Sequence, residues 1–235
     1  MVNSDANEKI ENLIKDLSSS YPITVGKAAL GLAEIGKIPE NGKIVEKEVV
    51  KILKDQKISA MKLAGAVQVL ETMVRTANIG LDANTIKTLK GVMKNKTNLK
   101  TVEGEAAILN SCRAVIKSVE KEAKLTNESA KEIALSLIEI LKSRSEQGNN
   151  IQIQIEAAKT MGKLFEKYPL GELKTLAKKA VEPLLKREDR IILGLGNEIN
   201  LGELAGKAAK DALEKIDKSK SVSVSVQQKK KAIIT

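Results

Sequence analysis

The sequence predicts an all-α protein, a solenoid of about ten helices in roughly five antiparallel pairs stacked into a superhelix. Apolar residues recur at three- and four-residue spacing along nearly the whole chain, whereas strand patterns are scarce. The 235 residues include two tyrosines, one phenylalanine and no tryptophan. The apolar residues are therefore mainly Ala, Ile, Leu and Val, which suit many thin helix-to-helix contacts better than one thick core.

Capping residues and prolines set the expected helix boundaries. Asp5 and Glu8 have the spacing of a capping box, and Pro22 suits the first turn of the second helix. Asp82 and Thr126 are candidate N-caps because their side chains can accept hydrogen bonds from the first turn. The helices are expected at residues 5–18, 22–37, 41–55, 57–77, 83–95, 100–122, 127–144, 151–167, 171–187 and 198–218.

Some helices contain residues that need a separate interpretation. The alternation IQIQI at 151–155 is typical of a strand, but the helical apolar pattern continues through Ala158, so we predict a helix. Pro183 should kink or divide the ninth helix, because proline lacks the N–H donor. Glycines inside predicted helices indicate close helix approach, with tolerance in a long helix as the alternative. These glycines are Gly26, Gly31, Gly36, Gly65 and Gly162.

A short motif recurs along the chain: a small residue, then apolar residues three and six positions later. The copies are Ala29-Leu32-Ile35, Val67-Leu70-Met73, Ala106-Leu109-Cys112, Ala158-Met161-Leu164 and the weaker Gly206-Ala209-Ala212. Successive copies are 38, 39, 52 and 48 residues apart, and one further amphipathic helix lies between each copy and the next. An isolated helix pair cannot bury its apolar face, so this recurrence predicts helix pairs that stack on one another.

In its pairing, its period and its alanine-rich first helices, the sequence resembles the HEAT-like and armadillo-like α-solenoid superfamily over residues 22–218. The recurrent Asp and Arg of that family's intra-repeat turn are not seen, so the subfamily is left open. The resemblance implies a right-handed α-solenoid of HEAT-like pairs, with the second helices lining a concave surface. It also implies a non-catalytic scaffold or adaptor that binds a protein partner through that surface.

The composition bears on chemistry and on location. With no His and one Cys, the usual metal sites and His-based nucleophilic triads are excluded, and we expect no catalytic residue, metal or cofactor. A HEAT-like enzyme remains an open alternative, because Lys, Glu and Tyr can transfer protons. Cys112 falls in an apolar slot of the motif and is expected to be a buried structural thiol. The single thiol and the polar amino terminus favour a cytoplasmic protein with no membrane contact.

Lysines on the second helices are the candidate partner-binding residues. Residues 57–100 carry eight basic and two acidic side chains, a net charge of +6 out of +10 for the whole chain. Within this stretch the lysines at 87, 90 and 94 form one stripe on the fifth helix. The candidates are Lys87, Lys90, Lys94, Lys51, Lys54, Lys174 and Lys178, with Lys47 beside them.

Three interpretations of these lysines stay open. They could bind an acidic protein partner, they could follow the phosphate backbone of a nucleic acid, or they could be a solvated surface. Glu128, Glu132 and Glu139 lie on the helix between the lysine-bearing ones and would oppose a nucleic-acid track. The stripe also has no aromatic or arginine side chain on which bases could stack. The partner's identity and the oligomeric state are not determined by the sequence.

The chain divides into a helical domain at 1–218 and a basic tail at 219–235. In the tail, Val222, Val224 and Val226 alternate with serines, with no partner strand predicted in the chain. We expect a flexible tail, and the alternative is a strand that pairs with a sheet edge on a partner.

Overall fold

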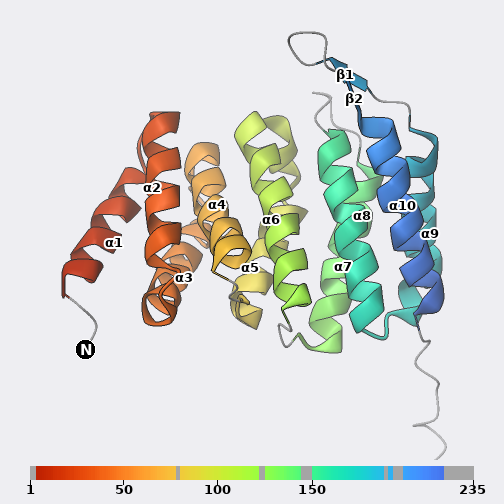
Figure 1. Ribbon diagram of the computed structural model, residues 1–235, viewed down its shortest axis with the longest axis horizontal. Coiled ribbons are helices and arrows are strands. Elements are labelled where there is room, and N and C mark those ends of the chain that lie inside the picture. The colour runs from red at the N-terminus through yellow and green to blue at the C-terminus, as the bar shows by residue number, and fades with distance from the viewer. Residues whose placement is uncertain are drawn as a thin grey trace, which may run out of the picture.

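The computed structural model describes residues 4–77, 80–121, 125–143, 150–187, 190–192 and 198–219. Within these ranges the regular elements are helices apart from two three-residue strands, so the prediction of an all-helical fold is confirmed (Figure 1). The α-helices are α1 (Ser4–Asp16), α2 (Pro22–Ile35), α3 (Pro39–Leu53), α4 (Ala60–Thr76), α5 (Ala83–Lys94), α6 (Val102–Glu120), α7 (Asn127–Lys142), α8 (Asn150–Lys167), α9 (Lys174–Val181) and α10 (Leu201–Lys218). The shorter elements are the 3-10 helices η1 (Lys96–Lys100), η2 (Gly171–Leu173) and η3 (Glu182–Lys186) and the strands β1 (Arg190–Ile192) and β2 (Glu198–Asn200).

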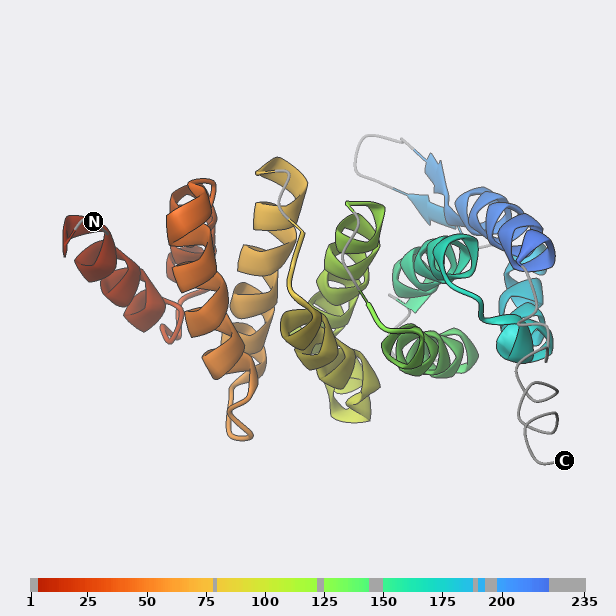
Figure 2. The ribbon, with the colours of Figure 1, turned by 90° about the horizontal axis from the view of Figure 1, so that it is seen from below.

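The helices stand side by side in two layers, which Figure 2 shows from below. Helices α2, α4, α6, α8 and α10 form the first layer, and each packs on the next. Helices α3, α5, α7 and α9 form the second layer in the same manner. Each second-layer helix also packs on the first-layer helix that follows it in the sequence, while α1 packs against α2 and α3. All five copies of the sequence motif therefore lie on first-layer helices, with one second-layer helix between successive copies.

One hydrophobic cluster runs the length of this row, from Ile10 on α1 to Ile216 on α10. Most of its members are Ala, Val, Ile and Leu, as the composition predicts. Phe165 on α8 is the largest fully buried side chain. Cys112 on α6 is buried as predicted, and burial raises the pKa of its thiol to about 12. No helix among the described residues is long and apolar enough to cross a bilayer.

The predicted caps form at Asp82 and Thr126, whereas Asp5 lies within the first turn of α1, which begins at Ser4. The Thr85 N–H donates to the Asp82 side chain at 2.6 Å, and the Ser129 N–H donates to the Thr126 hydroxyl at 3.1 Å. Pro22 begins α2 as expected. Pro39 likewise begins α3, although the sequence pattern indicates only a break there. Proline suits this position because the N–H groups of the first turn have no intrahelical acceptor, so a residue without an N–H loses no hydrogen bond there.

The stretch before α10 differs from the prediction. Pro183 divides the ninth helix into α9 and η3, as expected. Residues 198–200, predicted to be helical, instead form strand β2, which pairs antiparallel with β1. Helix α10 begins only at Leu201 because Asn200 caps it: its side chain accepts the Glu203 N–H at 3.0 Å. From residue 220 onward, the predicted tail lies outside the described residues.

The glycines predicted to allow close helix approach do so at some positions and not at others. A Cβ on Gly65 of α4 would lie 2.5 Å from Cγ1 of Val25 on α2. A Cβ on Gly162 of α8 would lie 3.1 Å from Cα of Ala212 on α10. Gly26 has nothing within 4 Å of the equivalent position, so the prediction of close approach is wrong there. A Cβ on Gly31 of α2 would lie 3.1 Å from Cδ1 of Leu13 on α1, so close approach occurs at the α1–α2, α2–α4 and α8–α10 interfaces.

Candidate binding groove

Two adjoining hollows lie along α3 and α5 in the second layer. The first has a volume of about 580 Å³ and is walled by α3 and by residues 80–85, which lead into α5. The second has a volume of about 710 Å³ and is walled by the end of α3, the connection to α4, α5 and η1. Lys54 and Asn84 line both hollows. We call the two hollows together the α3–α5 groove.

A line of four lysines on α3 borders this groove. Lys43, Lys47, Lys51 and Lys54 all line the first hollow, and all four are exposed. At 3.6 residues per turn they fall within an arc of about 80° on the helix. Lys51 forms an ion pair with Glu48 on the same helix, with Nζ and Oε1 2.6 Å apart. The ammonium groups therefore form a basic rim on the α3 side.

The three lysines of the predicted α5 stripe do not share one environment. Lys87 lines the second hollow and faces α3, and Lys94 follows two turns later on the same side of the helix. Lys90 points toward α7 instead, where it forms an ion pair with Glu132. The hydrogen bond from Lys90 lowers the pKa of Glu132, and the charges of Lys87 and Lys94 lower it further. The acidic residue predicted to oppose a nucleic-acid track thus neutralises one member of the stripe.

The predicted lysines of α9 lie apart from the groove. Helix α7 separates α9 from α5, and both lysines hold the end of α10. Lys174 Nζ donates to the main-chain carbonyl of Asp217 at 2.8 Å, and Lys178 Nζ lies 3.2 Å from the Asp217 carboxylate. The structure therefore brings Lys51, Lys54 and Lys87 together at the groove and assigns Lys174 and Lys178 to the α9–α10 contact.

A buried carboxyl at the base of the first hollow was not predicted from the sequence. Glu46 on α3 accepts the main-chain N–H of Asp82 at 3.0 Å and so ties α3 to the start of α5. Burial raises the pKa of Glu46 and outweighs the lowering effects of the nearby Thr85 side chain and the Asp82 N–H. Lys43 was also missed, although it continues the line of Lys47, Lys51 and Lys54 at a spacing of four. No sequence signal marks Glu46, because its partner is 36 positions away.

Replacing Glu46 by glutamine should raise stability at neutral pH. Because the folded protein holds the Glu46 proton more tightly than the unfolded chain, stability falls as pH rises from the unfolded pKa through the raised folded pKa. Glutamine keeps an acceptor for the Asp82 N–H and removes that loss. Urea denaturation of Glu46→Gln and the parent protein from pH about 4 to pH about 7 should show the variant gaining stability relative to the parent.

Glu132→Gln provides a control of opposite sign. The pKa of Glu132 is lowered by Lys90, so its contribution is present above the unfolded pKa and is lost as pH falls through the folded value. This variant should be less stable than the parent at pH about 7 and should converge with it in acid. If the stability difference from the parent changes with pH in the same direction for both variants, the pKa of Glu46 is not raised by burial.

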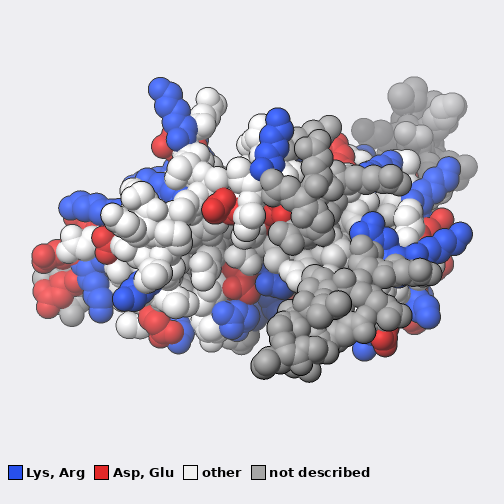
Figure 3. Space-filling view, turned by 90° about the horizontal axis from the view of Figure 1, so that it is seen from above, with Lys and Arg blue, Asp and Glu red and all other residues white. Residues whose placement is uncertain are grey.

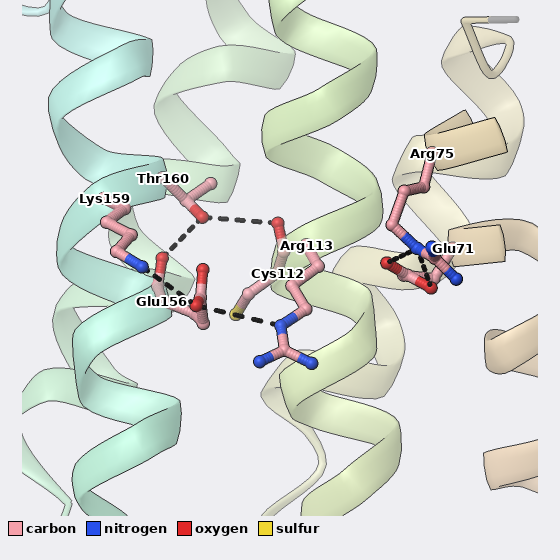
Figure 4. A network of polar contacts seen from close by, with 7 residues as sticks. All are labelled: Glu71, Arg75, Cys112, Arg113, Glu156, Lys159 and Thr160. Atoms are coloured by element: carbon pink, nitrogen blue, oxygen red, sulfur yellow. Dashed lines mark hydrogen bonds and ion pairs between the residues drawn. The ribbon is translucent and has the colours of Figure 1, made fainter. Parts of the chain in front are cut away.

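The first layer shows a contrasting arrangement, in which opposite charges meet (Figure 4). On α8, Oε1 of Glu156 lies 3.7 Å from Nε of Arg113 on α6 and 3.1 Å from Nζ of Lys159. On α4, Glu71 forms an ion pair with Arg75 at 3.1 Å. Seen from above in Figure 3, basic and acidic side chains also mix along the rim of the molecule. Opposite charges thus meet on the first layer, whereas lysines predominate along the α3–α5 groove.

No family model matches the sequence, and no curated protein matches it. Among solved structures, the chain is similar to an engineered protein of the Northeast Structural Genomics Consortium, with 20% identity and a TM-score of 0.54. The match covers 90% of this chain and 48% of the other, so this chain spans about half of its length. A second engineered protein from the same consortium matches with 18% identity and a TM-score of 0.35, covering 90% and 98% of the two chains. The first likeness agrees with the all-helical fold.

Proposed function

We propose that this protein is a non-catalytic scaffold or adaptor, built as a right-handed HEAT-like α-solenoid, that binds a partner protein through the α3–α5 groove. The two-layered stacking of helix pairs supports the architecture, because each pair contacts its neighbours and a long surface results. The non-catalytic role is supported by Cys112, whose buried thiol with a pKa of about 12 is a poor nucleophile. The binding role depends on the charge of the groove.

The observation that carries the proposal is a set of lysines that form no ion pair of their own. Among the described residues, five lysines on α3 and α5 have no ion pair within 4 Å: Lys43, Lys47, Lys54, Lys87 and Lys94. The other lysines of the second layer considered above are paired, as Lys90 is with Glu132 and Lys178 with Asp217. These lysines leave an excess of positive charge beside the groove, which is complementary to an acidic partner and would steer its approach.

A nucleic acid is the second candidate, because the same five lysines could neutralise phosphates. Full neutralisation of about five phosphates would give a slope near −4 to −5 for log affinity against log salt. The walls of the groove favour a protein instead. Glu46, Asp55 and Asp82 line the two hollows, and no arginine or aromatic side chain is among the described lining residues. A phosphate backbone would meet these carboxylates, and bases would find no stacking surface.

The test is affinity capture from a lysate of the source cells, with and without nuclease. A groove variant, Lys43→Glu/Lys54→Glu/Lys87→Glu, is compared with the parent protein. The matched control, Lys15→Glu/Lys27→Glu/Lys207→Glu, changes the net charge equally at exposed lysines of α1, α2 and α10. We expect a protein that the parent and the control retain, that the groove variant loses, and that nuclease does not release.

Two results would overturn the proposal. If every retained protein is kept equally by the groove variant, the groove is not the binding surface. If nuclease releases all retained protein and nucleic acid copurifies with the parent, the groove binds a phosphate backbone.

A further inference from the structure

We infer that the occupant of the α3–α5 groove is an acidic amphipathic helix of the partner, with carboxylates on the lysine rim and an aliphatic side chain on the floor of the first hollow. This inference rests on the proposed function and specifies the chemistry of the partner. It depends on the spacing of the lysines, on the floor between them, and on the position of Glu46.

The spacing of the rim matches a helix. Lys43, Lys47 and Lys51 follow one another at intervals of four residues, which is about 6 Å along α3. Carboxylates placed every four residues on a partner helix have the same interval, so ion pairs with Lys43 and Lys47 can form in register, while Lys51 already pairs with Glu48. Helix α3 has 15 residues and is therefore about 22 Å long, which a partner helix of similar length would span.

The floor of the first hollow is mainly apolar. Pro39, Gly42 and Val50 line it, together with the hydrocarbon stems of the lysines. Val50 is 6% exposed and turns the rest of its side chain into the core. An occupant made only of charged residues would leave this floor without contacts, whereas an aliphatic side chain would cover it.

The position of Glu46 excludes the partner's carboxylates from the floor of the first hollow. Its buried carboxyl is at the base of the first hollow, and burial already raises its pKa. A second carboxylate placed on the floor would meet this group at short range without solvent between them. The acidic side chains of the partner therefore bind at the rim, and the base of the hollow takes the apolar side chain.

The second hollow extends the same arrangement. Lys54 borders both hollows, and Lys87 lines the second one from the α5 side. A carboxylate held at the rim between Lys54 and Lys87 would face an ammonium group from each wall, whereas one that entered the hollow would meet Asp55. The partner helix thus carries acidic side chains where it meets the lysines and an aliphatic side chain over the floor of the first hollow.

The experiment is fluorescence anisotropy of the full-length protein with three labelled peptides of about 15 residues. One is a helix-forming peptide with glutamates and two leucines on one face. In the second, both leucines are replaced by glutamine at the same net charge. The third contains the residues of the first in scrambled order, so that no face is apolar. A short DNA duplex serves as the phosphate probe.

We expect the amphipathic peptide to bind, and the glutamine and scrambled peptides to bind about tenfold more weakly. The groove variant should weaken binding of the amphipathic peptide by at least about tenfold, and the control variant by less than about twofold.

Equal affinity for the leucine, glutamine and scrambled peptides would overturn the inference, as would equal binding to the groove and control variants. Tighter binding of the DNA duplex than of every peptide, with a salt slope near −4 to −5, would overturn it as well. The capture experiment separates this failure from failure of the proposed function. If the groove variant still loses a cellular protein while the peptides do not discriminate, the scaffold role stands and the helical docking segment is wrong.

Discussion

Replacing Phe165 by alanine is expected to lower the free energy of unfolding by about 3–5 kcal/mol. Phe165 is the one phenylalanine of the chain, and it is 1% exposed. It lies on α8, which packs against α6, α7 and α10. Alanine would leave a cavity at a buried position of α8. Urea denaturation followed by circular dichroism measures the loss.

Tyr21→Ala is the matched control, because it removes an aromatic ring of similar size from a side chain that is 72% exposed. Its effect should be within about 0.5 kcal/mol. Phe165→Leu should fall between the two, at less than about 1.5 kcal/mol, since leucine retains much of the volume. If Phe165→Ala and Tyr21→Ala cost the same, α8 does not hold the core at this position.

Replacing Gly104 by alanine is expected to cost about 3 kcal/mol, a large effect for one methyl group. Gly104 is in the first turn of α6, and a Cβ there would overlap the main-chain carbonyl of Asn98 in η1. Asn98 cannot easily move away, because it is buried and its side-chain amide donates to the Val92 carbonyl at 2.9 Å. The η1–α6 turn would have to open, and thermal unfolding would show a lower midpoint.

Gly91→Ala should have the opposite sign. Gly91 is an exposed glycine inside α5, and nothing lies within 4 Å of the position of its Cβ. Alanine there gains helix propensity without a clash, so stability should rise by up to about 1 kcal/mol. A loss of stability in Gly91→Ala similar to that in Gly104→Ala would show that close approach to Asn98 is not the cause.

The sequence was sufficient for the helices because their signals are local. Periodicity places each helix, and caps such as Asp82 and Thr126 set its start to within a few residues. The alternation of first-layer and second-layer helices also follows from the recurring motif. The strands β1 and β2 could not be predicted in this way, because each has three residues and is defined by its pairing with the other.

The candidate site was predicted only in part. The sequence identifies lysines on second-layer helices, and periodicity shows which of them share a line. It does not show that Lys90 meets Glu132, 42 positions later, or that Lys178 meets Asp217, 39 positions later. Which lysines are neutralised, and that Glu46 is buried between them, depends on how one helix pair packs on the next.

The reach of these contacts along the chain has a consequence for biosynthesis. Polar contacts between successive pairs join residues such as Asp82 and Glu46, 36 positions apart, or Thr160 and Cys112, 48 positions apart. A helix pair can therefore complete its contacts once the next pair has been made, without waiting for distant segments. The chain is suited to acquire structure from its amino-terminal end while the ribosome is still extending it, at the pace of translation.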